Sequence, residues 1–494
     1  MKNLKSRRFL CLFIVFMMIL PNFAYTVLAE DEKPAQEQTQ VLPAGGEAAI
    51  EDIYSSWAYW DVFMAYSVYG IGNEGTYSNF RGNFVWQKFL PVCEGLNKEF
   101  GIDFTIDVSD KDHLVTRGEI ISALYEIIVK TLKIDEKVEA VDYFSGNKLI
   151  NGRKDGDYQL EAACTGEEMI VFSVRVYEYL VYSLDLDAKG FFWKAAGEKG
   201  SVYLLGSIHI SDGSLYPVKK DILSAFDFSD HLVLEIDFAD ETEEDRNYID
   251  EIGFIKDGKT IKDYISPELY ESYIEICKIF EIPQEICDYL YPWYAQIVFD
   301  QISMGILFAG ENAENIDDIY DAFGNASDLG IDNYFTHRAL YLNKDIMALE
   351  STKLQIDMFA SFSPELQEAL LAGSLYNIYM LLGFAEEVKP EDEQKPEEEQ
   401  NIGIYDMLAM WKSGDEKSLG ELLGLDVTFE NPFDIEYNSK MFTERNIEMA
   451  KKIIIFLNES DDDYFVIVGA GHMLGEEGII NLLIKAGFTV ERIK

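Results

Sequence analysis

Two of the five histidines in this 494-residue chain share one sequence pattern, Gly-x-x-His, directly after an apolar run. His209 follows Gly206 after the run 202–205, and His472 follows Gly469 and Gly471 after the run 465–468. Glycine lets the backbone turn sharply and leaves room for a ligand. A single Gly-x-x-His is most often an ordinary loop histidine, but its repetition after two apolar runs favours two imidazoles that share one site.

A carboxylate, Glu235, ends a third apolar run, where it would be partly buried unless it is paired or bound to a metal. In open α/β sheets, ligands bind beyond the carboxyl ends of the strands. Two imidazoles and one carboxylate at such an edge suit a divalent Zn, Mn, Co or Fe ion, with positions left for water and substrate. A metal-bound water with a pKa of about 7 would then be the nucleophile of a hydrolase.

The apolar runs alternate with helical patterns from Phe191 onward. Because short buried strands separated by helices are typical of a mostly parallel or mixed sheet covered by helices, we expect an α/β (or α+β) fold for residues 190–494. The long helical insertion between the second and third strands would form a subdomain or lid. The expected strands are 202–205, 232–236, 346–349, 465–468 and 489–493, and the expected helices are 219–226, 267–280, 283–304, 332–342, 364–383, 438–457 and 475–486.

Residues 50–185 have a mainly helical pattern. Thr116 and Thr165 each precede a helical stretch and are followed three residues later by an acid, which predicts two capping boxes. The region resembles S-layer homology repeats, in which a hydrophobic residue and Thr-Arg-Ala-Glu open a helix. Arg117 keeps the repeat's arginine, whereas Gly166 replaces it in the second copy. The resemblance implies cell-wall polysaccharide as a partner and Arg117 as a wall-binding residue.

Three further segments stand apart by composition. Residues 1–29 combine a basic start, an apolar run and a small-residue end, which predicts a secretory signal peptide. An uncleaved membrane anchor is the alternative, although the run is short for a span of about 20 residues. Residues 30–49 are expected to be a polar linker, and 386–400 an acidic exposed loop. We therefore expect a secreted or extracytoplasmic protein without a stable membrane span, associated with the cell wall if the polysaccharide prediction holds.

The cysteine and charge counts limit the other sites and partners. The mature chain would hold Cys93, Cys164, Cys277 and Cys287, whose spacing matches no zinc motif. Cys277 and Cys287 are close enough in sequence to form a disulfide, and buried free thiols are the alternative. The formal net charge of −48 at pH 7 argues against nucleic acid as a partner, because binding to phosphates depends on Lys and Arg.

Several separated segments of residues 190–494 together resemble the TraB/GumN family, which includes the TIKI-type metalloproteases. The resemblance implies a sheet-based fold with the two histidines and the glutamate at its site, and metal-dependent hydrolysis in those members whose activity is known. The matching segments are 205–209, Glu235, 330–335, 349–351, Glu444-Arg445-Asn446, 468–479 and 486–490.

The resemblance also implies a role for each residue of the site. His209 and His472 would be metal ligands, and Glu235 either a third ligand or a general base. Arg445 would pair with Glu235 or stabilise a developing oxyanion. Two acids in the matching segments, Asp332 and Glu350, are further candidates for lining the site, although solvated carboxylates are the commoner case.

The leading hypothesis is an exported metal-dependent hydrolase that acts on peptides. The first alternative is a non-catalytic extracytoplasmic protein that binds a peptide or small molecule in the same crevice. The second is a cell-wall-associated scaffold that works through residues 50–185. A dinucleotide-binding loop at Gly469-x-Gly471 is excluded, because too few residues follow for the βαβ unit and the acidic residue that this motif requires.

Overall fold

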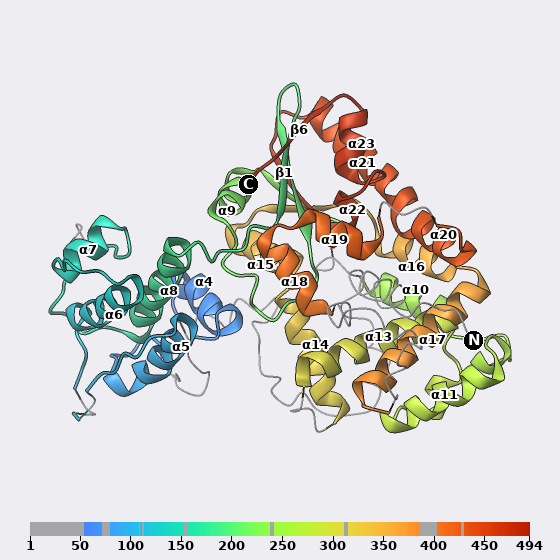
Figure 1. Ribbon diagram of the computed structural model, residues 1–494, viewed down its shortest axis with the longest axis horizontal. Coiled ribbons are helices and arrows are strands. Elements are labelled where there is room, and N and C mark those ends of the chain that lie inside the picture. Colours follow the sequence, from blue (N-terminus) through green and yellow to red (C-terminus); the bar gives the residue numbers. More distant parts are fainter. Residues whose placement is uncertain are drawn as a thin grey trace, which may run out of the picture. The chain divides into compact units, whose positions relative to one another are not determined.

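The computed structural model describes residues 54–71, 80–107, 109–110, 113–152, 157–237, 242–310, 315–384, 403–425 and 429–494. The segments predicted as signal peptide (1–29), linker (30–49) and acidic loop (386–400) lie outside these residues. The described chain divides into two compact units, a helical one that ends at Asp187 and one with a sheet that begins at Ala188 (Figure 1). Within the described ranges, no helix is long and apolar enough to cross a membrane.

The helical unit is built on the two predicted capping boxes, and both are confirmed. Thr116 and Thr165 accept hydrogen bonds from the backbone N–H groups of Glu119 and Glu168, and each glutamate side chain bonds back to the backbone N–H of its threonine. The elements are η1 (Ser56–Ala58), α4 (Tyr59–Phe63), η2 (Met64–Val68), η4 (Trp86–Phe89), α5 (Leu90–Phe100), α6 (Arg117–Leu132), α7 (Ala140–Gly146) and α8 (Gly166–Ser183).

Arg117, the residue predicted to bind the cell wall, is the first residue of α6 and is buried. Its guanidinium lies 2.5 Å from the carboxylate of Glu168 on α8, and its Nε donates to the carbonyl of Tyr158 at 2.8 Å. The same guanidinium lies 5.0 Å from the centre of the Phe172 ring. These contacts connect α6 to α8. The S-layer resemblance and the binding of polysaccharide stay predictions.

The second unit contains one sheet of six strands: β1 (Phe191–Ala196), β2 (Ser201–Ser207), β3 (His231–Leu234), β4 (Asp345–Ala348), β5 (Tyr464–Gly469) and β6 (Thr489–Arg492). The strand order is β4-β3-β5-β2-β1-β6. The pairs β2–β5, β3–β5 and β3–β4 are parallel, and β1 pairs antiparallel with β2 and β6. The expected mostly parallel or mixed sheet, preceded by a helical region, is therefore confirmed.

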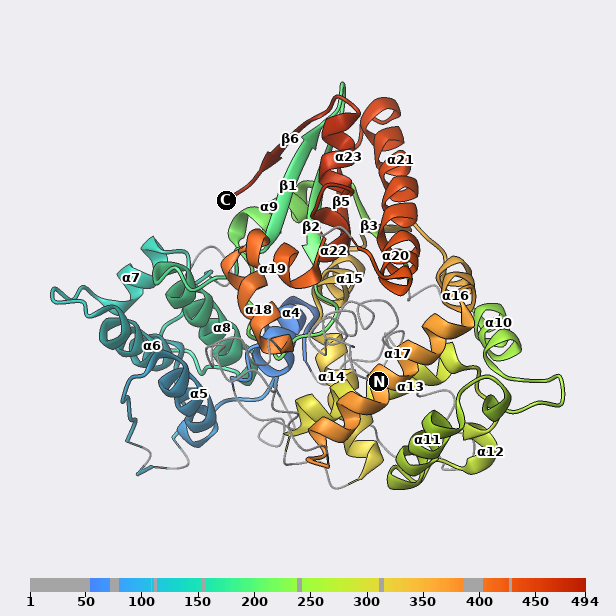
Figure 2. The same ribbon diagram turned by 45° about the vertical axis from the view of Figure 1, so that its right-hand side comes forward.

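Helices surround this sheet and fill the insertion between β3 and β4, which runs from α10 to α15 as expected (Figure 2). Near the sheet, α15 contacts β3 and β4, whereas α21 contacts β2. The helices are α9 (Lys220–Phe228), α10 (Glu243–Gly253), η7 (Ile261–Asp263), α11 (Pro267–Ile279), α12 (Gln284–Cys287), α13 (Pro292–Ala309), α14 (Ile316–Asp328), α15 (Ile331–Leu342), α16 (Thr352–Ala360), α17 (Pro364–Leu381), α18 (Ile404–Ser413), α19 (Glu416–Leu423), α20 (Pro432–Asn438), η10 (Ser439–Thr443), α21 (Glu444–Glu459), α22 (Ala470–Met473) and α23 (Ile479–Lys485).

The structure corrects one predicted helix and adds elements that the pattern does not predict, among them one strand of the sheet. The pattern predicts one helix over 283–304, but α12 and α13 are separate, because Tyr291 is extended (φ −66°, ψ 150°) before Pro292. Strand β1 has no counterpart among the predicted strands, because Lys194 interrupts its apolar run. In the structure the Lys194 ammonium lies 5.1 Å from the centre of the Tyr203 ring on the paired strand, so its stem covers an apolar neighbour.

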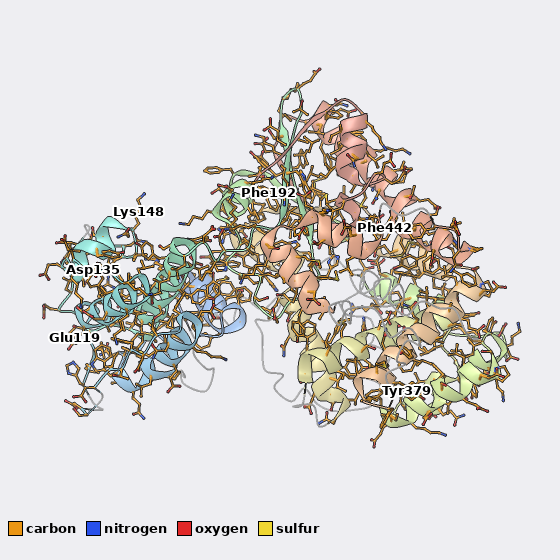
Figure 3. The ribbon with its side chains drawn as sticks, viewed as in Figure 1. Glu119, Asp135, Lys148, Phe192, Tyr379 and Phe442 are labelled. Carbon is orange, nitrogen blue, oxygen red and sulfur yellow. A yellow bond between two sulfur atoms is a disulfide. The ribbon has the colours of Figure 1, made fainter. Side chains whose placement is uncertain are left out.

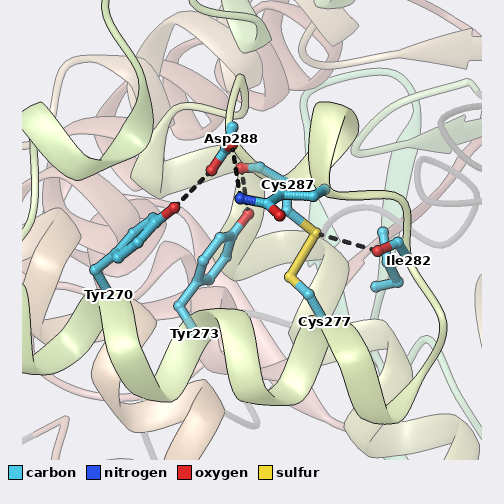
Figure 4. The surroundings of a disulfide bond; sticks show 7 residues. Tyr270, Tyr273, Cys277, Ile282, Cys287 and Asp288 are labelled. Carbon is cyan, nitrogen blue, oxygen red and sulfur yellow. Dashed lines mark hydrogen bonds between the residues drawn. A yellow bond between two sulfur atoms is a disulfide. The ribbon is translucent and has the colours of Figure 1, made fainter.

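The pairing of the cysteines, left open by the sequence, is decided by the helical insertion. Cys277 on α11 and Cys287 on α12 form a disulfide, whereas Cys93 and Cys164 are buried outside it. Figure 4 shows the surroundings of this disulfide, where the Tyr273 hydroxyl donates to the Cys287 carbonyl at 2.7 Å. The disulfide and this hydrogen bond both hold α12 against α11.

The sheet positions the site through the ends of its central strands. In the parallel register Ser207 of β2 lies beside Gly469 of β5, and Leu234 of β3 lies beside Ile467 of β5. The chain segments that carry His209, Glu235 and His472 therefore leave the sheet at one edge, which is the edge where open α/β sheets bind ligands.

Candidate metal and catalytic site

Gly469, the last residue of β5, marks the place where three predicted site residues meet. A Cβ atom on this glycine would lie 3.5 Å from His472 Cδ2, 3.6 Å from His209 Nε2 and 3.7 Å from Glu235 Oε2. The exposed fractions of His209, Glu235 and His472 are only 6%, 5% and 4%. The structure thus places two imidazoles and one carboxylate around one small buried space.

His472 is held in one orientation by Asn446 of α21. Nδ1–H of the imidazole donates to Asn446 Oδ1 at 2.6 Å, and Asn446 Nδ2 donates to the carbonyl of Glu477 at 2.9 Å. Burial and the nearby Arg445 guanidinium lower the pKa of His472 to about 3. The ring is therefore neutral at pH 7, with its proton on Nδ1 and the lone pair of Nε2 directed to the Glu235 side of the site, where Oε2 lies 3.8 Å away.

His209 is held in the same way by Asp332 of α15. Its Nδ1 lies 2.6 Å from Asp332 Oδ2, and its Nε2 has no hydrogen-bond partner among the described residues. Burial alone would lower the pKa of His209, but the Asp332 carboxylate, with a smaller effect from Glu235, raises it above its usual value. Gly330 precedes α15 and packs against the His209 carbonyl so closely that a Cβ there would clash with it.

Glu235 is fixed by Arg445 rather than left free. Arg445 on α21 donates to Glu235 Oε1, and it donates to both carboxylate oxygens of Glu350 at 2.6–3.0 Å. Gln355 Nε2 donates to Glu235 Oε1 at 2.9 Å and to Glu350 Oε2 at 3.0 Å. Burial would raise the pKa of Glu235, but Arg445 and the two histidines lower it to about 2. Glu235 is therefore a carboxylate at pH 7, and its Oε2 accepts a hydrogen bond from the Gly469 N–H at 3.2 Å.

The other two motif glycines lie in close packing contact with their neighbours. A Cβ on Gly206 would lie 3.1 Å from the Ala470 Cα, and one on Gly471 would lie 2.8 Å from the Phe442 ring. Phe442, labelled in Figure 3, also has its ring centre 5.3 Å from that of His472. These glycines let the turns after β2 and β5 pack against their neighbours.

The donor set of the site fits a divalent metal. His209 Nε2 lacks a partner in the described structure, and His472 offers a neutral Nε2. Bonds of about 2.0–2.2 Å place two ligands of a tetrahedral ion about 3.4 Å apart, close to the 3.8 Å between His472 Nε2 and Glu235 Oε2. In the described ranges, no group of three or more His, Cys, Asp or Glu side chains is arranged so that it could hold a metal ion, so the fit rests on the chemistry of the donor atoms and not on a preformed site.

The charge balance of the site also fits a cation. Two buried carboxylates, those of Glu235 and Glu350, pair with one guanidinium, that of Arg445, and a third buried carboxylate, that of Asp332, bonds to His209. Buried charges are costly unless they are paired or coordinate a metal. Because both imidazoles must be neutral to coordinate a metal, a divalent ion would balance the two remaining negative charges.

Three residues of this network have no role in the sequence prediction. Asn446 directly follows Arg445 in the Glu444-Arg445-Asn446 segment that resembles the family, and this position is the sequence feature that points to it. Gln355 is a single glutamine in the middle of α16, and no pattern marks it. Trp411 of α18 donates from Nε1 to the Gly206 carbonyl at 2.6 Å and is fully buried; its only signal is that tryptophan is scarce, with six in the chain.

The other three histidines lie apart from this site. His113 pairs with Glu119 in the helical unit at 2.9 Å. His231 begins β3 and lies between Asp345 and Asp462, at the opposite end of the strand from Glu235. Burial within α15 lowers the pKa of His337.

A family model described as the TraB/PrgY/gumN family matches residues 191–492, more than half of the chain. The chain belongs to the TraB/PrgY/gumN family. The matched residues run from the start of β1 to the end of β6 and include the whole site. The predicted resemblance to TraB/GumN proteins is therefore confirmed for the unit that contains the sheet.

Two relatives of this TraB/PrgY/gumN chain are metalloproteases by name. A "Metalloprotease TIKI homolog" of Nematostella vectensis is 37% identical over 62 residues, which are 12% of this chain and 13% of that protein. "Metalloprotease TIKI2" of Xenopus tropicalis is 37% identical over 59 residues, which are 12% of this chain and 11% of that protein. The similarity is distant and covers a small part of each relative. No solved structure matches the chain.

Proposed function

We propose that this chain is an extracytoplasmic, metal-dependent hydrolase that acts on peptides. The observation that carries the proposal is the convergence of His209, His472 and Glu235 on one buried space beside Gly469. The partial similarity to two proteins named metalloproteases supports peptides as the substrate class.

His209 and His472 would hold the metal through Nε2, and Glu235 would be the third ligand or a base beside it. When bound, the ion supplies a Lewis acid and lowers the pKa of a bound water to about 7. Asn446 and Asp332 each accept a hydrogen bond from the Nδ1–H of one imidazole, which leaves Nε2 of that ring as the donor atom. These two partners thus fix the tautomer that coordination requires.

Arg445 and Gln355 anchor Glu235 through Oε1, so that Oε2 stays directed toward the two histidines. Because the pKa of Glu235 is about 2, this oxygen is ionised and can bind a cation at neutral pH. So low a pKa makes it a weak base, which favours the role of metal ligand over that of general base. Arg445 donates from Nε and Nη2 to Glu350 and Glu235, and from Nη1 to the Met441 carbonyl at 3.4 Å. This supports the pairing role of Arg445 over direct stabilisation of an oxyanion.

Two observations support an extracytoplasmic location. Residues 1–29 have the composition of a signal peptide. The Cys277–Cys287 disulfide is of a kind that persists in oxidising compartments and is rare in the cytosol.

Metal analysis and peptide cleavage of the full mature chain test the proposal. Wild type should bind about one divalent ion per chain and cleave members of a peptide library, as read by mass spectrometry. His209→Ala and His472→Ala should lose both properties. His113→Ala is the matched control, because His113 is a partly exposed histidine of the helical unit, and it should keep both.

Two outcomes would contradict the proposal. Equal metal content in wild type and in both site variants would rule out the metal site. Metal binding with no cleavage of any peptide, but with retention of specific peptides, would instead support the non-catalytic binding protein.

A further inference from the structure

Ser207, the second residue of the first Gly-x-x-His motif, has a hydroxyl with no evident use in the fold. The residue is fully buried at the end of β2, and its Oγ finds no hydrogen-bond partner within the described ranges. A buried hydroxyl without a hydrogen-bond partner loses its bonds to water and gains none in return, which is destabilising. A serine at this position therefore weakens the fold unless something else bonds to it.

The sheet register shows the face to which the Ser207 side chain projects. Ser207 is paired with Gly469 across β2 and β5, and paired residues of neighbouring strands project from the same face of a sheet. On that face, a Cβ at Gly469 would touch His209 Nε2, His472 and Glu235 Oε2. Neighbouring strands are about 4.8 Å apart, so the Ser207 hydroxyl borders the same space as the three site residues.

The backbone on both sides of Ser207 is held rigidly. Trp411 Nε1 donates to the Gly206 carbonyl at 2.6 Å, directly before Ser207. The Ile331 N–H donates to the Ile208 carbonyl at 3.0 Å, directly after it. The backbone around Ser207 is thus fixed, and the hydroxyl can move mainly by rotation of its own side chain. Such a positioned donor is of the kind that stabilises developing charge.

A nucleophilic role for Ser207 does not fit the contacts. An activated serine needs a base within hydrogen-bond reach of its Oγ. The nearest imidazole in sequence is His209, and its Nε2 is also without a partner among the residues described, so the two atoms are not bonded to each other. The hydroxyl is better suited to donating a hydrogen bond to a ligand than to attacking one.

We propose that Ser207 is a catalytic residue whose Oγ–H donates a hydrogen bond to the substrate oxygen that becomes negatively charged during hydrolysis. This inference rests on the proposed function and extends it, because it assigns the oxyanion contact to Ser207 and leaves Arg445 as the anchor of Glu235. No bond to Ser207 forms or breaks.

The test compares wild type, Ser207→Ala and Ser207→Thr, all as full mature chains loaded with zinc. Inorganic phosphate is the probe, because it is a tetrahedral oxyanion, and its binding is measured by isothermal titration calorimetry. Ser207→Ala should weaken phosphate binding about 10- to 100-fold, as expected for the loss of a hydrogen bond to a charged group, whereas Ser207→Thr, which keeps the hydroxyl, should stay close to wild type. On a cleaved peptide, Ser207→Ala should lower kcat about 10²- to 10³-fold with KM unchanged.

Thermal unfolding supplies a readout that is independent of activity. The Tm of Ser207→Ala should equal or exceed that of wild type, because the variant removes an unsatisfied buried hydroxyl. A clear fall in Tm would mean that the hydroxyl bonds within the protein, and it would overturn the proposal. So would phosphate binding that is equal in Ser207→Ala and wild type, or absent from both. Phosphate binding that depends on Ser207 in a chain that cleaves no peptide would refute the peptidase function but support Ser207 as the oxyanion donor.

Discussion

Asn446 Oδ1 lies 2.6 Å from His472 Nδ1, and the same amide donates from Nδ2 to the Glu477 carbonyl. Because the amide nitrogen is bonded elsewhere, its oxygen must face the imidazole, and the imidazole must carry its proton on Nδ1. One asparagine thereby sets the tautomer of a predicted metal ligand.

Asn446→Ala should weaken metal binding about 10- to 100-fold, the usual effect of losing a hydrogen-bond partner of a ligating histidine. The measurement is a competition titration with a chromophoric zinc chelator at pH 7. Asn147→Ala is the matched control, because Asn147 is exposed in the helical unit and its side-chain amide donates to the Tyr143 carbonyl. An affinity for zinc that is the same in Asn446→Ala and wild type would remove Asn446 from the site.

Gly469→Ala should abolish metal binding without unfolding the protein. Its backbone (φ −47°, ψ 138°) suits any residue, and the added Cβ would make contacts of 3.5–3.7 Å, which are ordinary packing distances. The methyl group would nevertheless occupy the space between the three predicted ligands. Metal content by mass spectrometry and Tm together check this result. Gly420→Ala on α19 has open space around its Cβ and should change neither; metal retained by Gly469→Ala would show that the ion lies elsewhere.

Arg445→Met should destabilise the fold by about 3–5 kcal/mol, because it leaves the buried carboxylates of Glu235 and Glu350 without their cation. The same change should raise the pKa of Glu235, since Arg445 is the main group that lowers it. Urea denaturation at pH 7 measures the loss in free energy of unfolding. Arg338→Met removes a more exposed pair with Asp227 and should cost no more than about 1 kcal/mol. Equal losses in the two variants would contradict this account.

Asp300→Asn should stabilise the protein at neutral pH. Asp300 is fully buried on α13. Its carboxyl group accepts hydrogen bonds from the uncharged side chains of Gln296 and Ser374, and burial raises its pKa well above the usual value. A raised folded-state pKa means that the unfolded chain releases this proton first, so stability falls as the pH rises above the unfolded value of about 4.

The gain from Asp300→Asn should therefore be on the order of 1 kcal/mol or more at pH 7 and should shrink toward pH 4. Urea denaturation at both pH values measures it. Asp317→Asn, at an exposed position in the first turn of α14, is the control. A gain for Asp300→Asn that does not depend on pH would exclude the titration of Asp300 as its cause.

Much of the candidate site could be predicted from the sequence alone. The two Gly-x-x-His motifs and Glu235 each follow an apolar run, and the ends of parallel strands meet at one edge for any sequence that forms such a sheet. The capping boxes of Thr116 and Thr165 could also be predicted from the sequence, because each involves contacts between residues only three positions apart. Such features depend on local geometry, which a short stretch of sequence encodes directly.

The partners of these residues depended on the folded chain. Asp332 is 123 residues from His209 in the sequence, and Arg445 is 210 residues from Glu235 and 95 from Glu350. The sequence around each of these residues does not indicate which residue it contacts. The same holds for the hydroxyl of Ser207, whose direction follows from its register with Gly469 on a strand far along the chain. Local sequence patterns thus predicted which side chains belong to the candidate site. The protonation, orientation and charge balance of these side chains depend on contacts that form only when the helices pack on the sheet.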